Sequence, residues 1–167
     1  IKCPKAFVAI ISNPVNSLVP LAAQILKSKG LYNPRKLCGI TQLDVLRARS
    51  FIANKYEINP EEIDIPVIGG HAGTTIVPLL SQCSYKVNQE DKEELIVRIQ
   101  NAGTEVVEAK EGTGSATLSM AVAANMFLEQ VMKGLTGEGI GKACAYVDIG
   151  ELEFFADMCI YDYNGLI

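Results

Sequence analysis

The chain has 167 residues, 49% hydrophobic and 20% charged, so it can bury a core and does not belong to the disordered class. Its formal net charge of -4 comes without a cationic block, which makes nucleic acids and anionic membranes poor partners. The five cysteines stand far apart and there is a single histidine, so we expect a reducing compartment, no disulfide framework and no structural metal site.

The first forty residues read as a strand, a helix and a second strand. The apolar run 7–11 is typical of a strand covered on both faces of a parallel sheet. A helix capped by Asn16 or Ser17 follows and ends at Gly30, and residues 37–41 are the next strand candidate. This is the length of one βαβ unit. The chain begins with Ile1 and no targeting segment, so we expect it to start inside a longer α/β sheet.

The rest of the chain mixes helices and strands. We expect a helix from 42 to about 55, opened by a capping box at 41–44, and then a strand over 63–67. A glycine-rich loop over 69–73 and an apolar run over 76–80 follow. Further along we expect a helix over 90–108, a break at 112–114, a helix over 116–135, and antiparallel strands over 142–148 and 153–161. The apolar stretch 116–135 contains Ser119, Asn125, Glu129 and Gln130, which would be costly in a bilayer, so it predicts a buried helix.

His71 is the first candidate for chemistry. Its neighbours Gly69, Gly70, Ala72 and Gly73 have almost no side chain to shield it, so we expect it to be accessible to a ligand. An ordinary imidazole exchanges its proton near neutral pH, which makes this histidine a candidate general acid and base. The residues alone leave open a glycine-rich turn that merely tolerates a histidine.

Asp44 and Arg47 lie three residues apart on the predicted helix and therefore share one face. They could be a capping acid and a surface ion pair. Alternatively, the carboxylate could orient an imidazole while the guanidinium binds a substrate carboxylate with two hydrogen bonds. The local sequence fits both interpretations.

Asn13 ends the first predicted strand, and the carboxyl ends of strands are where ligands bind in open α/β sheets. Its amide could donate to a substrate oxygen, although an asparagine before Pro14 is also a common turn residue. Neither G-x-G-x-x-G nor G-x-x-x-x-G-K-[ST] occurs, and the Gly112–Gly114 segment follows a helix and lacks a third glycine. We therefore predict no phosphate-binding loop in these residues.

Taken together, these motifs resemble the lactate/malate dehydrogenase family over nearly the whole chain. The matching stretches are IISNPVNSLVP (10–20), ITQLDVLRARSF (40–51), PVIGGHAGTTIVPLLSQ (66–82) and GTGSATLSMAVAA (112–124). The resemblance implies an α/β fold in which residues 1–40 are the remnant of a Rossmann-type, NAD-binding parallel sheet. Residues 41–167 would be the mixed α+β substrate domain that carries the catalytic residues.

The resemblance also implies roles for individual residues. His71 matches the catalytic proton donor and acceptor, Asp44 the acid bound to its imidazole, and Arg47 the group that binds the substrate carboxylate. The residues matched to the substrate oxygen and the nicotinamide cofactor are Asn13, Ile11, Ser12 and Met120.

The implied reaction is the reversible, NAD-dependent oxidation of L-malate to oxaloacetate by a homodimer. GGHAG is similar to the malate enzymes of mitochondria and bacteria, whereas lactate enzymes typically carry an acidic residue at the position of Gly70. We expect the mitochondrial matrix or another organelle such as a microbody, with a bacterial cytoplasm as the alternative.

Some parts of the family pattern lie outside these 167 residues. They are the glycine-rich turn, the acidic ribose ligand and the mobile loop with substrate-binding arginines, so we expect the isolated chain to be inactive. The competing hypotheses are another 2-hydroxy acid dehydrogenase of the lactate type, and a non-catalytic fragment that dimerises through Phe51, Ile52 and Tyr56.

Overall fold

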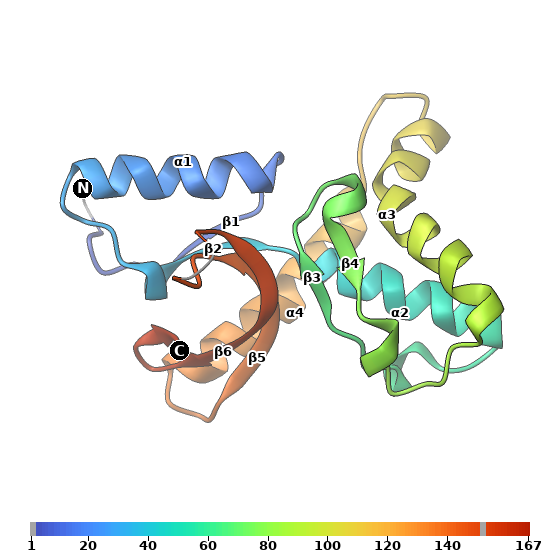
Figure 1. Cartoon of the computed structure of the whole chain (residues 1–167). Helices are drawn as coiled ribbons and strands as arrows, with labels where there is room; N and C mark the ends of the chain where they lie inside the picture. The colour runs from blue at the N-terminus through green and yellow to red at the C-terminus, as the bar shows by residue number, and fades with distance from the viewer. Residues whose placement is uncertain (1–2, 151–152) are drawn as a thin grey trace.

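The computed structural model describes residues 3–150 and 153–167 (Figure 1). Its helices are α1 (Val15–Ser28), α2 (Gln42–Tyr56), α3 (Lys92–Ala109) and α4 (Thr117–Leu135). Its strands are β1 (Val8–Ile10), β2 (Leu37–Ile40), β3 (Val67–Gly69), β4 (Ile76–Pro78), β5 (Gly141–Val147), β6 (Phe155–Asp162) and β7 (Gly165–Leu166). The expected α/β fold class is confirmed.

The strands form one mixed seven-stranded sheet in the order β1-β2-β5-β6-β3-β4, with β7 beside β6. Only β1 and β2 run parallel, and the remaining pairs are antiparallel. The strand expected over 7–11 is present as β1, at the parallel end of the sheet. β1 has three residues, pairs only with β2 in the described part of the chain, and leaves Val8 42% exposed.

Two helices cover opposite faces of β2 and β5 (Figure 1). Val15 and Val19 of α1 pack against Leu37 and Tyr146 on one face. Phe127 of α4 lies in a cluster on the other face. The alternation of side chains along a strand produces both contacts, because successive residues of β2 and β5 point to opposite sides.

A third cluster joins α2 and α3 to β3 and β4, in the right-hand part of Figure 1. Ile52 of α2 is fully buried there, and Phe51 and Tyr56 pack against the same cluster. Phe51 also lies under the Arg98 guanidinium, 4.3 Å from its ring centre, and Tyr56 donates to Asp91. Ile52 is therefore unavailable for the dimer contact suggested by the sequence, whereas Phe51 and Tyr56 are only partly buried within the chain.

The structure also corrects how two helices begin. Neither Asn16 nor Ser17 caps α1, which starts at Val15 after Pro14, so Asn16 lies inside the first turn. α2 does start at Gln42, but the predicted capping box is wrong because Thr41 makes no side-chain cap bond. The side chains of Asn16 and Asp44 both reach the loop that carries His71 instead. The two polar groups expected to cap helices thus contact the candidate site.

The other predicted elements are present in the structure, but some have different bounds. Ile63, Ile65 and Val67 are all buried, as their alternation predicts, but only Val67–Gly69 pairs as a strand. α3 begins at Lys92, after a short turn over Gln89–Asp91. The antiparallel pair β5–β6 and the helix over 117–135 are confirmed, but the helix is not buried as expected. Only Ala123, Phe127, Val131 and Gly134 of α4 are buried in the described chain, and Leu118 is 85% exposed, because α4 packs on the sheet by one face.

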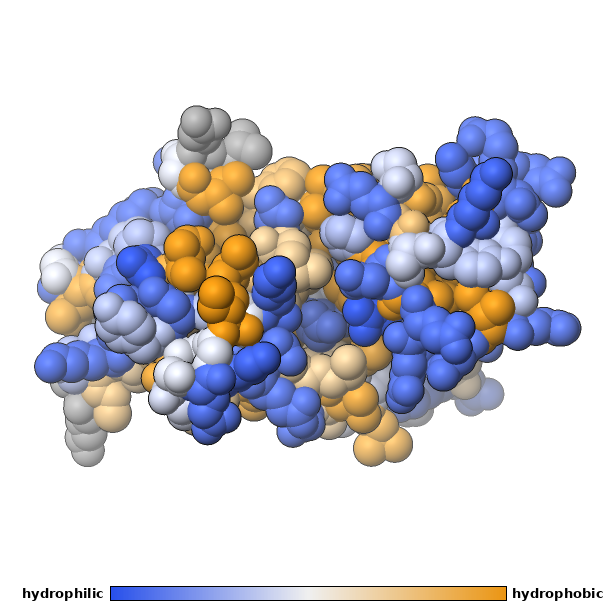
Figure 2. Space-filling view, turned by 90° about the horizontal axis from the view of Figure 1, so that it is seen from below, coloured by the Kyte–Doolittle hydropathy of each residue, from blue (hydrophilic) through white to orange (hydrophobic). Residues whose placement is uncertain are grey.

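All five cysteines are free thiols, and three of them lie in the core. Burial raises the pKa of Cys144 to about 11 and that of Cys159 to about 12, so both stay protonated at neutral pH. In the described residues, no helix combines the length and the apolar character needed to cross a membrane. Figure 2 shows hydrophobic side chains interspersed with hydrophilic ones on the face seen from below.

Candidate functional site

Every residue that the sequence analysis assigned to the site lies on one cleft of about 680 Å³. These residues are Ile11, Ser12, Asn13, Asp44, Arg47, His71 and Met120. They come from the segment after β1, the first turns of α2, the loop after β3, and α4. The fold thus brings together positions that are more than a hundred residues apart in the sequence.

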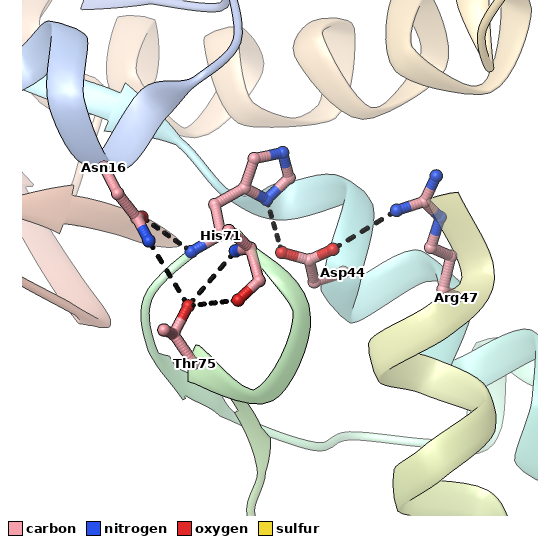
Figure 3. Close-up of polar contacts among 6 residues, drawn as sticks. Asn16, Asp44, Arg47, His71 and Thr75 are labelled. Carbon is pink, nitrogen blue, oxygen red and sulfur yellow. Dashed lines mark hydrogen bonds and ion pairs between the residues drawn. The ribbon is translucent and has the colours of Figure 1, made fainter. Parts of the chain in front are cut away.

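His71 and Asp44 form the closest polar contact of the cleft (Figure 3). Nδ1 of His71 lies 2.5 Å from Oδ2 of Asp44. An ionised carboxylate can only accept hydrogen bonds, so Nδ1 donates to Asp44, and in the neutral imidazole Nε2 carries the lone pair. Nε2 points away from Asp44 in Figure 3 and can exchange a proton with a ligand. The His71 side chain is only 7% exposed, so it is more enclosed than its small neighbours suggest.

Asp44 is fully buried and also contacts Arg47. Its Oδ1 accepts from Nη1 of Arg47 at 3.4 Å, a long contact between residues one helical turn apart. A buried carboxylate is costly unless it is paired, and the guanidinium supplies the opposite charge. Since a guanidinium carries five N–H donors, this contact leaves donors with which Arg47 can bind an anion. Its side chain is 15% exposed.

The main chain of the His71 loop is held by two residues that the sequence analysis did not assign to the site. Oδ1 of Asn16 accepts from the backbone N–H of His71 at 2.8 Å, and Nδ2 of Asn16 donates to Oγ1 of Thr75 at 3.3 Å. The Thr75 side chain closes the loop through two further bonds with the backbone of Ala72. The only sequence signal for Asn16 was a polar residue near the start of an apolar helix.

The far wall of the cleft is formed by α3 and the segment before α4. It adds polar side chains that the sequence analysis also missed, namely Gln100, Asn101, Thr104 and Ser115. Nε2 of Gln100 donates to the carbonyl of Ile76 at 2.9 Å, which ties α3 to β4. In the described ranges, no group of three or more histidine, cysteine, aspartate or glutamate side chains could hold a metal ion.

Comparison with known protein families matches residues 41–167 to the lactate/malate dehydrogenase α/β C-terminal domain. The chain is 55% identical to the chloroplastic malate dehydrogenase of Arabidopsis thaliana, over 98% of this chain and 42% of the relative. It is 52% identical to the mitochondrial malate dehydrogenase of Eucalyptus gunnii, over 98% of this chain and 49% of the relative. The chain therefore spans less than half the length of these relatives.

Two solved structures share the fold. A malate dehydrogenase from Cryptosporidium parvum superposes with a TM-score of 0.82 at 24% identity, over 98% of this chain and 55% of that one. A lactate dehydrogenase from the same organism, complexed with lactic acid and nicotinamide adenine dinucleotide, gives 0.79 at 27% identity, over 98% and 54%. From its sequence and its fold, the chain belongs to the lactate/malate dehydrogenase family, and residues 41–167 are that family's C-terminal domain.

Proposed function

We propose that this chain supplies the catalytic half of a malate dehydrogenase, which oxidises L-malate reversibly to oxaloacetate with NAD as the hydride acceptor. The observation that carries the proposal is the His71–Asp44 contact, at 2.5 Å, in a cleft that also contains Arg47 and Asn13. A paired imidazole can accept the hydroxyl proton of a hydroxy acid, a guanidinium can bind its carboxylate, and an amide can donate to its oxygen. The identity of 55% with a malate dehydrogenase supports this choice of substrate.

In the proposed reaction, Arg47 binds one carboxylate of malate through charge-assisted hydrogen bonds and so orients the carbon that carries the hydroxyl group. Asn13 donates its amide N–H to the hydroxyl oxygen. Nε2 of His71 accepts the hydroxyl proton as the carbonyl forms, and Asp44 stabilises the resulting imidazolium. In the reverse direction, His71 returns the proton to the same oxygen.

The residues of the cleft fit the nicotinamide end of the cofactor. Ile11, which is 45% exposed, and Met120 offer apolar contacts, while Ser12 and Asn13 offer polar ones on the same cleft. When bound there, NAD supplies the hydride acceptor of the reaction. We propose that residues 1–40 are the end of the domain that holds the rest of the cofactor.

The proposal includes a homodimer and a location in an organelle. Relatives of this chain are named chloroplastic, peroxisomal, glyoxysomal and mitochondrial malate dehydrogenases, which supports an organelle without selecting one. Light scattering of the full-length enzyme tests the dimer, and fluorescence microscopy of the tagged full-length protein tests the location.

A hybrid enzyme tests the activity directly. Residues 1–167 are joined to the part of the Arabidopsis chloroplastic relative that precedes the match, with that relative as the positive control. We expect NAD-dependent oxidation of L-malate and little oxidation of L-lactate. A hybrid that binds NADH but oxidises neither substrate would contradict a catalytic role, and a preference for lactate would contradict the substrate.

A further inference from the structure

We propose that Asn16 and Thr75 are positioning residues that fix the backbone of the catalytic loop, so that His71 is held at both its ring and its main chain. This inference rests on the proposed role of His71 as the general acid and base. Asp44 of α2 holds the ring through Nδ1, and Asn16 of α1 holds the backbone N–H (Figure 3). Residues of two helices therefore hold His71, one at its ring and one at its backbone. We call the hydrogen bonds that Asn16 and Thr75 make with the His71 loop the clamp.

The donors and acceptors of the Thr75 hydroxyl fix the orientation of the Asn16 amide. The Thr75 hydroxyl has one proton and two lone pairs. Its proton goes to the carbonyl of Ala72 at 2.7 Å, and its lone pairs accept from the N–H of Ala72 at 3.1 Å and from Nδ2 of Asn16 at 3.3 Å. The Asn16 amide must therefore present its nitrogen to Thr75, which turns its oxygen toward the N–H of His71. No donor or acceptor of the Thr75 hydroxyl is left over.

Two glycines of the loop lie where a side chain would collide with Thr75 or Asn16. The N–H of Gly70 donates to the carbonyl of Thr75 at 2.8 Å, which closes the loop across its base. A Cβ on Gly70 would lie 2.5 Å from Oγ1 of Thr75 and 2.9 Å from Nδ2 of Asn16. Gly69 has φ +94°, a conformation that only glycine adopts easily, and a Cβ there would lie 2.3 Å from the Thr75 carbonyl oxygen. The glycines thus allow the clamp to close.

Such a clamp matters because proton transfer depends on distance. A displacement of about 1 Å in a reacting group can lower a rate by about 10²-fold. Asp44 alone fixes the direction of the His71 ring, but the ring can still move with its backbone. Asn16 and Thr75 remove that freedom, and they do so from outside the binding cleft, since neither lines it.

Thr75 offers a clean test because its neighbour Thr74 is the same residue type and is likewise exposed. In the hybrid enzyme, Thr75→Val removes the hydroxyl at nearly constant volume, Thr75→Ser keeps it, and Thr74→Val is the matched control. We expect Thr75→Val and Asn16→Leu to lower kcat by about 10- to 100-fold with KM for malate changed less than about threefold. Thr75→Ser, Thr74→Val and Ser17→Ala should stay near wild type. Loss confined to KM, no loss, or equal loss in Thr75→Val and Thr75→Ser would overturn the proposal.

A second measurement does not depend on activity. Amide hydrogen exchange in the 167-residue chain, followed by NMR, should show His71 N–H exchanging at least about tenfold faster in Asn16→Leu, and Ala72 N–H faster in Thr75→Val. Unchanged exchange would overturn the clamp itself. If exchange responds but the wild-type hybrid has no malate activity, the proposed function fails while the clamp stands.

Discussion

At the scale of single residues, Asp44 contacts two side chains, those of His71 and Arg47, which have different roles in the proposed reaction. Its carboxylate is fully buried, and its two oxygens contact His71 and Arg47. Burial keeps competing water away, which strengthens both contacts, and the Arg47 charge offsets the cost of burying the carboxylate. The same side chain therefore sets the tautomer of the histidine and the position of the guanidinium. Each partner can be removed by a substitution with a distinct effect.

His71→Asn is expected to abolish turnover while leaving NADH binding nearly intact. The amide cannot exchange a proton near neutral pH, and the loss of general acid and base catalysis costs about 10²–10⁴-fold in kcat. Steady-state kinetics of the hybrid enzyme measure turnover, and fluorescence titration measures NADH affinity. More than half of the wild-type kcat at neutral pH would exclude the role assigned to His71.

Arg47→Lys is expected to lower kcat/KM for malate by at least about 10²-fold with cofactor affinity unchanged. An ammonium group is a point charge and cannot form the planar two-point contact with a carboxylate. Arg49→Lys is the matched control, because Arg49 sits on the same helix and pairs with Asp64, which is 77% exposed. Such surface pairs contribute little. If Arg47→Lys and Arg49→Lys had the same kcat/KM for malate, Arg47 would be a structural ion-pair residue and not the group that binds the substrate carboxylate.

The sequence predicted seven residues of the cleft, but not the polar side chains that α3 adds to it or the residues that support the His71 loop. Asn13, Asp44, Arg47 and His71 stand in ordered motifs, so each could be assigned before the fold was known. The clamp joins Asn16 to positions 55 and 59 residues away, and no local pattern encodes such a bond. From its local sequence alone, Asn16 is therefore interpreted as a helix cap.

At the scale of elements, helices were easier to predict than strand pairing. The apolar recurrence in the sequence of α2 and α4 indicates a helix from short windows. Pairing joins distant segments, such as β2 with β5 and β3 with β6, and only three-dimensional packing decides it. β3 meets β6 through the Gly69–Ala156 pair alone, and this contact places the start of the His71 loop.

Gly39→Ala is expected to lower the free energy of unfolding by about 1–3 kcal/mol, because a larger side chain overpacks the contact between α1 and β2. The added Cβ would lie 2.4 Å from Cγ1 of Val15 and 2.8 Å from Cγ2 of Val19. Gly114→Ala is the matched control, since its nearest neighbour would be the Lys110 side chain at 3.7 Å. Urea unfolding of both variants measures the free energy of unfolding. Equal midpoints would contradict the prediction, because they would show that α1 can move away from the added Cβ without loss of stability.

At the scale of the whole molecule, the cleft draws on both sides of residue 40. Asn13 comes from the segment before β2, whereas Asp44, Arg47 and His71 come from the domain over 41–167. The sheet is continuous across this boundary, because β2 pairs with both β1 and β5. Anything that moves α1 relative to the rest of the chain therefore changes the cleft and the clamp on the His71 loop together.

The 167-residue chain alone is expected to bind NADH too weakly to detect at micromolar concentration and to oxidise no malate. The residues proposed to contact the cofactor, Ile11, Ser12, Asn13 and Met120, are assigned to its nicotinamide end alone. Most of the affinity for a dinucleotide comes from a glycine-rich turn at a helix N-terminus and an acid on the ribose, and no such turn occurs in these residues. Calorimetric titration of the chain, with the hybrid enzyme as the positive control, measures the difference. Micromolar binding by the chain alone would show that the cleft holds more of the cofactor than the nicotinamide, and would refute the assignment of the remaining contacts to a separate domain.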